Sequence, residues 1–149
     1  PIQSNKTRAI AEQFDWVHTV ERERIARRLS DQRPADRAPL DVCIEVNVSG
    51  EATKSGVAPA DVPALARSVS SLPGLKLRGL MAIPEPTGDM ALQRRRFAEL
   101  RAIRDALARD GLALDTLSMG MSADLEAAIA EGATMVRVGT AIFGERTKT

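Results

Sequence analysis

The sequence contains no tyrosine, a single histidine and a single cysteine among its 149 residues. One histidine without partners cannot assemble a metal site or a Ser/His catalytic relay, so we interpret His18 as structural. Cys43 stands alone in an apolar run and has no partner for a disulfide within the chain. These scarcities argue against metal chemistry and against a nucleophilic triad.

The sequence also has no excess of positive or negative charge and no long apolar run. The chain carries 21 Lys and Arg residues against 20 Asp and Glu, a formal net charge of +1. This balance gives no electrostatic footprint for nucleic acid or for a membrane surface. No apolar run approaches the ~20 residues of a membrane span, and no secretory signal is visible in the residues given. We therefore expect a cytoplasmic protein.

Strand-like and helix-like patterns alternate along the chain. Runs near residues 15–20, 40–48, 75–83, 115–119 and 135–138 are typical of β-strands. Helical patterns lie between them, the clearest at 59–72, 89–109 and 124–130. Such alternation predicts a parallel sheet with helices outside, in which ligands bind at the carboxyl ends of the strands.

The stretch from residue 116 to residue 144 holds two successive strand-to-helix junctions. Ser122 stands where the N-cap of the helix 124–130 is expected, and Gly139 and Thr140 follow the next strand. Helix N-termini present free N–H donors and a partial positive charge, which suits a phosphate group. In (β/α)8 barrels, a phosphate site is often built after the last two strands with a short extra helix.

Arg137 breaks the apolar pattern of the strand at 135–138. Because strand residues alternate between faces, Met135, Arg137 and Gly139 share the inward face. A buried arginine needs an anionic partner or a strong acceptor. Two explanations stand: a structural ion pair with an acidic residue elsewhere, or a bound ligand, which the neighbouring phosphate-type junctions favour.

Ordered sequence blocks give these features a family context. The run S-M-G-M-S-A-D-L-E-A-A-I and the later M-V-R-V-G-T-A-I-F-G follow the upstream blocks P-I-Q-S-N-K, I-E-V-N-V-S-G-E-A-T-K-S-G and L-R-G-L-M-A-I-P. Together they resemble the pyridoxal phosphate homeostasis proteins, also called proline synthetase co-transcribed homologues. Those proteins are similar to the barrel domain of alanine racemase. The resemblance implies a (β/α)8 barrel of the alanine racemase N-terminal type.

The same resemblance implies which residues meet pyridoxal 5'-phosphate (PLP). By this resemblance, Ser122, Gly139 and Thr140 are expected to contact the phosphate, and Arg137 is expected to face the pyridine nitrogen. The remaining cofactor-binding positions are Asn5, Met81 and Met121. Two lysines are weaker candidates. Lys6 adjoins the Asn5 block, and Lys54 belongs to a loop that borders the pocket in a role that the resemblance leaves open.

The function implied is a non-catalytic carrier that buffers PLP inside the cell. Alanine racemases use a tyrosine as one of two acid/base groups, and this chain has none. Two alternatives stay open: a racemase-like PLP enzyme acting on amino acids, and a fragment that binds another phosphorylated ligand without a covalent cofactor.

The length of the chain fits only part of such a barrel, which typically needs roughly 250 residues. We expect residues 1–149 to be the C-terminal portion of a single PLP-binding barrel domain, supplying its last five strands. The family holds PLP as a Schiff base on a lysine in a block resembling V-S-K, and no such block occurs here. A missing N-terminal fragment or a second copy of the chain is then needed to complete the barrel.

A covalent test follows from the absence of that lysine block. We expect the 16.0 kDa chain to carry no adduct by intact mass spectrometry after incubation with PLP and reduction with borohydride. A stoichiometric adduct on one of its lysines would contradict the assignment of the Schiff-base lysine to another segment. A lysine-dependent PLP enzyme treated in parallel serves as the positive control.

Overall fold

The computed structural model describes residues 1–50 and 55–144. Its strands are β1 (Trp16–Val20), β2 (Leu40–Glu45), β3 (Leu75–Ala82), β4 (Thr116–Met121) and β5 (Met135–Arg137). Its helices are α1 (Thr7–Gln13), α2 (Glu23–Asp31), α3 (Val62–Ser70), α4 (Met90–Arg109), α5 (Leu125–Ala130) and α6 (Thr140–Phe143). Short 3-10 turns, η1 (Ser4–Lys6) and η2 (Pro59–Asp61), precede α1 and α3.

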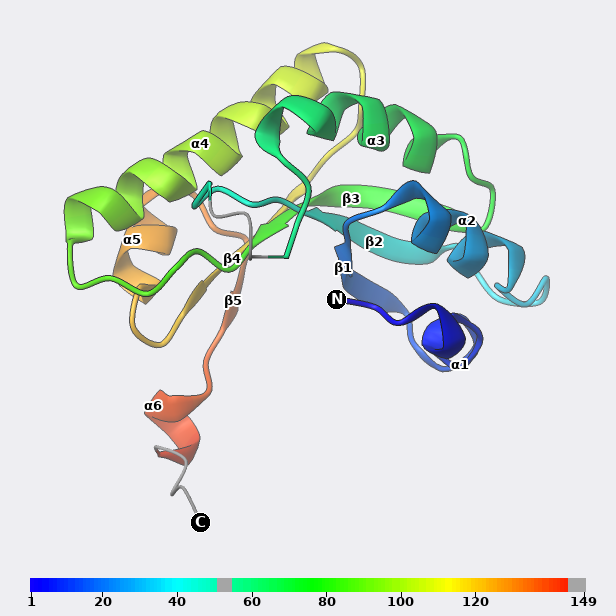
Figure 1. Cartoon of the computed structure of the whole chain (residues 1–149), viewed down its shortest axis with the longest axis horizontal. Helices are drawn as coiled ribbons and strands as arrows, with labels where there is room; N and C mark the ends of the chain where they lie inside the picture. Colours follow the sequence, from blue (N-terminus) through cyan, green and yellow to red (C-terminus); the bar gives the residue numbers. More distant parts are fainter. Residues whose placement is uncertain (51–54, 145–149) are drawn as a thin grey trace.

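The strands form one parallel sheet in the order β1-β2-β3-β4-β5, so every neighbour in the sheet is also a neighbour in the sequence. Figure 1 shows α3 and α4 lying along one side of this sheet, and α6 projecting away from it beyond β5. The predicted alternation of five strands with helices is confirmed. No helix among residues 1–50 and 55–144 is both long and apolar enough to cross a membrane.

The two faces of the sheet differ in chemistry. Toward the helices, Ile44, Leu80 and Leu117 are completely buried members of the hydrophobic core. The alternate residues point the other way: Glu45 pairs with Met81, and Met81 pairs with Ser118. We call this second surface the inner face and define it by His18, Glu45, Met81, Ser118 and Arg137. It carries the polar groups at the carboxyl ends of the strands.

Gly79 allows β3 and β4 to approach closely. It pairs with Thr116 of β4, and a Cβ atom added to Gly79 would lie 1.8 Å from the Thr116 carbonyl oxygen. No side chain fits there without separating the two strands, because the obstructing atom belongs to the backbone. Glycine at this position therefore sets the spacing of the sheet beneath the inner face.

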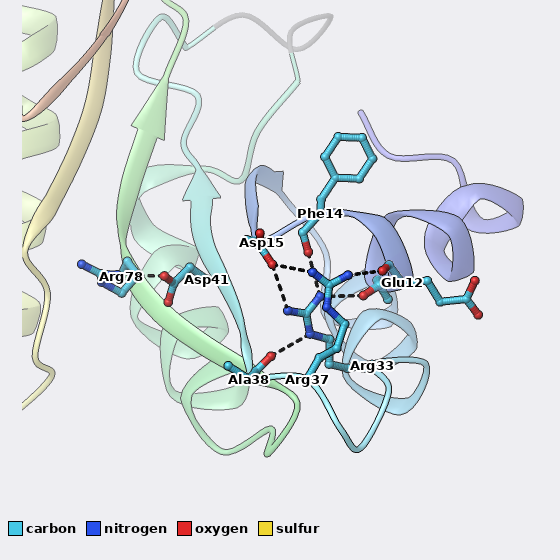
Figure 2. A network of polar contacts seen from close by, with 9 residues as sticks. Glu12, Phe14, Asp15, Arg33, Arg37, Ala38, Asp41 and Arg78 are labelled. Carbon is cyan, nitrogen blue, oxygen red and sulfur yellow. Dashed lines mark hydrogen bonds and ion pairs between the residues drawn. The ribbon is translucent and has the colours of Figure 1, made fainter.

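Two arginines after α2 hold the start of β1 in place (Figure 2). Arg33 donates to the carbonyl oxygens of Ala11, Phe14 and Ala38 at 2.6, 2.7 and 2.8 Å. Arg37 donates to the Glu12 carbonyl and to Asp15. Guanidinium groups suit this task because they carry five fixed donors and stay protonated.

Two arginines of helix α4 form ion pairs with α5. Arg94 and Arg101 reach Glu131 at the end of α5, with N···O distances of 2.8 and 2.9 Å. The Glu131 carboxylate is only 6% exposed, so the two cations compensate a buried charge. These pairs fasten α5 to α4 and position the segment that leads into β5.

Two local predictions from the sequence are wrong. The predicted N-cap, Ser122, does not cap α5; Asp124 takes that position and accepts a hydrogen bond from the Met121 N–H. The strand expected at 40–48 ends at Glu45, and beyond it Val46 forms an isolated parallel bridge with Val57.

The close approach at Gly79 gives a stability prediction. We expect Gly79→Ala to lower the free energy of unfolding by about 3 kcal/mol, because the added methyl forces β3 and β4 apart. Gly88→Ala is the matched control: a Cβ there meets nothing within 4 Å, and the change should stay within about 1 kcal/mol. Urea unfolding followed by circular dichroism measures both. Equal midpoints for the two variants would contradict the packing argument.

Candidate functional site

A cavity opens where β4 and β5 end. It has a volume of about 870 Å³ and is lined by Met121, Ser122, Ala123, Gly139, Thr140, Phe143 and Gly144. The Ser122 hydroxyl oxygen lies 3.2 Å from the Gly139 nitrogen and 3.3 Å from the Ala141 nitrogen, and it accepts from both N–H groups. Ser122 thus joins the end of β4 to the first turn of α6. The cavity lining combines the hydroxyl-bearing residues Ser122 and Thr140 with the exposed apolar side chains of Met121 and Phe143.

Arg137 lies on the inner face next to this cavity. Its Nη1 donates to the Ser118 hydroxyl at 2.6 Å, and its Nη2 donates to the Ala82 carbonyl at 3.1 Å. Its Nε is buried and has no hydrogen-bond partner among the described residues. Burial lowers the pKa of the guanidinium, which nonetheless stays protonated.

The structural ion pair considered for Arg137 is not present in the described part of the chain, where its hydrogen-bond partners are the Ser118 hydroxyl and the Ala82 carbonyl. A buried N–H without an acceptor costs about 1–3 kcal/mol. The free Nε is therefore a donor that suits an acceptor atom of a ligand. This observation favours the second explanation for Arg137, a bound ligand.

Sequence reasoning missed two members of this cluster. Ser118 is completely buried, and its oxygen lies 2.8 Å from Nδ1 of His18. Serine in an apolar strand and a single histidine 100 residues away carry no local signal of contact. Only the curvature of the sheet, which brings β1 across to β4, places the two together. His18 belongs to the polar cluster of the inner face.

Two further ionisable groups occupy the inner side of β2. Burial raises the pKa of the Cys43 thiol to about 12, so Cys43 is a neutral, unreactive thiol at physiological pH. Burial also raises the pKa of Glu45, whose Oε2 atom has no hydrogen-bond partner among the described residues. Cys43 therefore adds no charge to the inner face, and burial favours the neutral form of Glu45 more than it would for an exposed glutamate.

The structure gathers most of the residues predicted for the site. Met121, Ser122, Gly139 and Thr140 line one cavity. Met81 is buried beside Ser118 in the sheet register, next to the Arg137 contact.

Two of the predicted positions lie apart from this cluster, and one cannot be placed. Asn5 and Lys6 are exposed on η1, and within the described chain neither is hydrogen-bonded to the cavity residues. Lys54 lies outside the described residues.

The arrangement suits one kind of ligand. The hydroxyl donors at the cavity fit a phosphate group, and the free Arg137 Nε fits a neutral acceptor such as a ring nitrogen. No group of three His, Cys, Asp or Glu side chains in residues 1–50 and 55–144 is placed to hold a metal ion. A phosphorylated heteroaromatic compound, as PLP is, matches both sets of donors.

Comparison with known proteins identifies the same family that the sequence blocks resemble. The family model described as "Alanine racemase, N-terminal domain" matches residues 1–147. The pyridoxal phosphate homeostasis protein of Pseudomonas aeruginosa is 66% identical over 146 residues, which cover 98% of this chain and 62% of that protein. The chain therefore spans less than two thirds of the length of this curated relative.

Solved structures agree with the family match. PipY of Synechococcus elongatus with PLP bound superposes with a TM-score of 0.85 at 36% identity, covering 97% of this chain and 68% of PipY. Alanine racemase of Clostridium difficile shares the fold at a TM-score of 0.81 and 13% identity, covering 99% of this chain and 39% of the racemase.

The five parallel strands are thus part of a (β/α)8 barrel. The match over residues 1–147 and the barrel site at the ends of β4 and β5 lead to one conclusion: the chain belongs to the alanine racemase N-terminal domain family, and its close curated relatives are pyridoxal phosphate homeostasis proteins.

Proposed function

We propose that this chain is the C-terminal portion of a single barrel domain that binds PLP and acts in PLP homeostasis as a non-catalytic carrier. The observation that carries the proposal is the buried, unpaired Nε of Arg137 beside a cavity of phosphate-type donors. The names of its relatives and the PLP-bound PipY support the same ligand.

In this proposal the phosphate meets the junction of β4, β5 and α6. The Ser122 hydroxyl already gathers the N–H groups of Gly139 and Ala141 around one oxygen, and Thr140 adds a second hydroxyl at the cavity wall. The two hydroxyls can donate to phosphate oxygens, which are acceptors. Met81 and Met121 supply polarisable apolar surface for the ring. Asn5 stays a candidate from the family resemblance alone.

Arg137 decides what kind of chemistry the site favours. PLP supplies an aldehyde and a ring that withdraws electrons most strongly when its nitrogen is protonated. A guanidinium has donors only, so Arg137 can hold the ring nitrogen only in its unprotonated form. The site therefore retains the cofactor while leaving its ring a weak electron sink, which suits storage better than transamination or decarboxylation.

The acid/base groups available within this chain support a non-catalytic role. The chain has no tyrosine, and its one histidine, His18, is engaged with Ser118. The thiol of Cys43 is held neutral by burial, which raises its pKa to about 12. Proton transfer at the cofactor thus lacks an evident acid/base pair within these residues.

Two substitutions test the site. We expect Arg137→Ala and Ser122→Ala each to weaken PLP binding by about 10- to 100-fold, because each removes a charge-assisted hydrogen bond worth about 1.5–3 kcal/mol. Isothermal titration calorimetry with PLP gives the dissociation constants. Wild-type affinity in both variants would remove the site assignment.

The controls separate PLP from other ligands. Arg95→Ala and Ser71→Ala alter exposed residues of the same types, on α4 and after α3, and should bind PLP as the wild type does. Pyridoxal without its phosphate and inorganic phosphate without its ring should each bind more weakly than PLP. Equal affinity for inorganic phosphate and PLP would favour a general phosphate site instead.

A further inference from the structure

The hydrogen bonds behind Arg137 form a chain that crosses the inner face. Arg137 Nη1 lies 2.6 Å from the Ser118 oxygen, and that oxygen lies 2.8 Å from His18 Nδ1. The three residues belong to β5, β4 and β1, and two strands separate β1 from β4 in the sheet. A contact between such distant strands ties one edge of the curved sheet to the other.

The direction of this chain follows from its donors. Arginine can only donate, so the Ser118 oxygen accepts from Arg137. Ser118 is completely buried, and its own hydroxyl hydrogen needs an acceptor, which His18 Nδ1 supplies at 2.8 Å. His18 is then a neutral imidazole with its proton on Nε2. The chain runs from Arg137 through Ser118 to His18.

The charges on this face favour the neutral imidazole. Burial, together with the positive charge of Arg137, lowers the pKa of His18 below its usual value of 6.5. The ring beside it, Trp16, carries no charge. The other titratable or charged groups on these strands are Cys43 and Glu45 on β2, the exposed Lys76 on β3, and the Arg78 cluster with Asp41 and Asp115. The Pro1 amino group and Glu21 act on Glu45 from outside the sheet. Cys43 is neutral, and Arg78 is compensated by its two aspartates.

We infer that His18 and Ser118 are positioning residues for Arg137, and that protonation of His18 loosens the guanidinium and weakens retention of the cofactor. A protonated Nδ1 donates instead of accepting, which leaves the Ser118 hydrogen without an acceptor and adds a second positive charge beside Arg137. The part of this inference that concerns cofactor retention, called the cofactor arm below, rests on the proposed function. The part that concerns the hydrogen-bond chain does not.

The sign of the pH dependence is fixed. The chain of hydrogen bonds is complete while His18 is neutral, at pH values above its pKa, and is lost as the pH falls through that pKa. A carrier built this way holds PLP at neutral pH and releases it more readily in acid. The orientation of Arg137 Nε, the donor without a partner in the described chain, is the quantity that His18 controls.

The hydrogen-bond chain can be tested without cofactor. His18 is the only histidine, so ¹H–¹⁵N spectra of the labelled 149-residue chain show one imidazole, which needs no assignment. Between about pH 5 and pH 8 we expect the Nε2–H tautomer and a pKa below 6.5. Ser118→Ala should raise that pKa and mix the tautomers, because the neutral ring loses a donor. Thr116→Val, which removes another buried β4 hydroxyl, should change neither.

An Nδ1–H tautomer in the wild type overturns the inference, and so does an unchanged pKa in Ser118→Ala. The tautomer of His18 in the wild type tests the hydrogen-bond chain even if the Ser118→Ala variant does not fold.

The cofactor arm compares pH profiles of PLP binding by calorimetry. PLP titrates in the same range, so the informative quantity is the difference between the wild type and His18→Asn, which keeps an acceptor but cannot be protonated. We expect acidification from about pH 7.5 to 5.5 to weaken wild-type binding about fivefold more than it weakens binding by His18→Asn. Glu45→Gln, which removes the other acid-range group of this face, should keep the wild-type difference.

Identical profiles for the wild type and His18→Asn overturn the inference. Failure of PLP to bind at any pH, with the Nε2–H tautomer intact, overturns the proposed function and the cofactor arm, and leaves the hydrogen-bond chain standing.

Discussion

The parallel pairing of β1 to β5 in sequence order is the constraint on which the rest of the molecule depends. Each crossover must place a helix on the same side, so the core residues Ile44, Leu80 and Leu117 face helices and their neighbours face inward. The same parallel pairing brings the carboxyl ends of all five strands to the same end of the sheet. Gly79 keeps two of these strands in close register, because any side chain there would meet the Thr116 carbonyl.

A buried cation on the inner face shapes the chemistry at that edge. Arg137 is held by Ser118 and the Ala82 carbonyl, and its remaining donor has no protein partner in the described chain. The desolvation cost of a guanidinium in such a place is offset when it meets an acceptor. An arginine without a carboxylate partner in the described chain keeps a donor for an acceptor atom, and in the proposed function this acceptor is the unprotonated ring nitrogen of PLP.

Family membership establishes the fold of this chain, whereas the local geometry bears on the chemistry of its site. The match over residues 1–147 establishes the barrel family, but alanine racemase of Clostridium difficile shares that fold at 13% identity. Fold therefore does not select between an enzyme and a carrier. That choice depends on which groups can transfer protons at the site, and among these His18 is hydrogen-bonded to Ser118 and Cys43 is a neutral thiol.

The sequence by itself determined the five strands, the parallel class of the sheet and the inward face of Arg137, since these follow from local periodicity and alternation. It also identified Ser122, Gly139 and Thr140 as one group, because short junctions keep such residues together. Tertiary structure alone decided that Ser122 serves α6 rather than α5, and that His18 meets Ser118 from 100 residues away. Contacts of that kind depend on the curvature of the whole sheet, which no local pattern encodes.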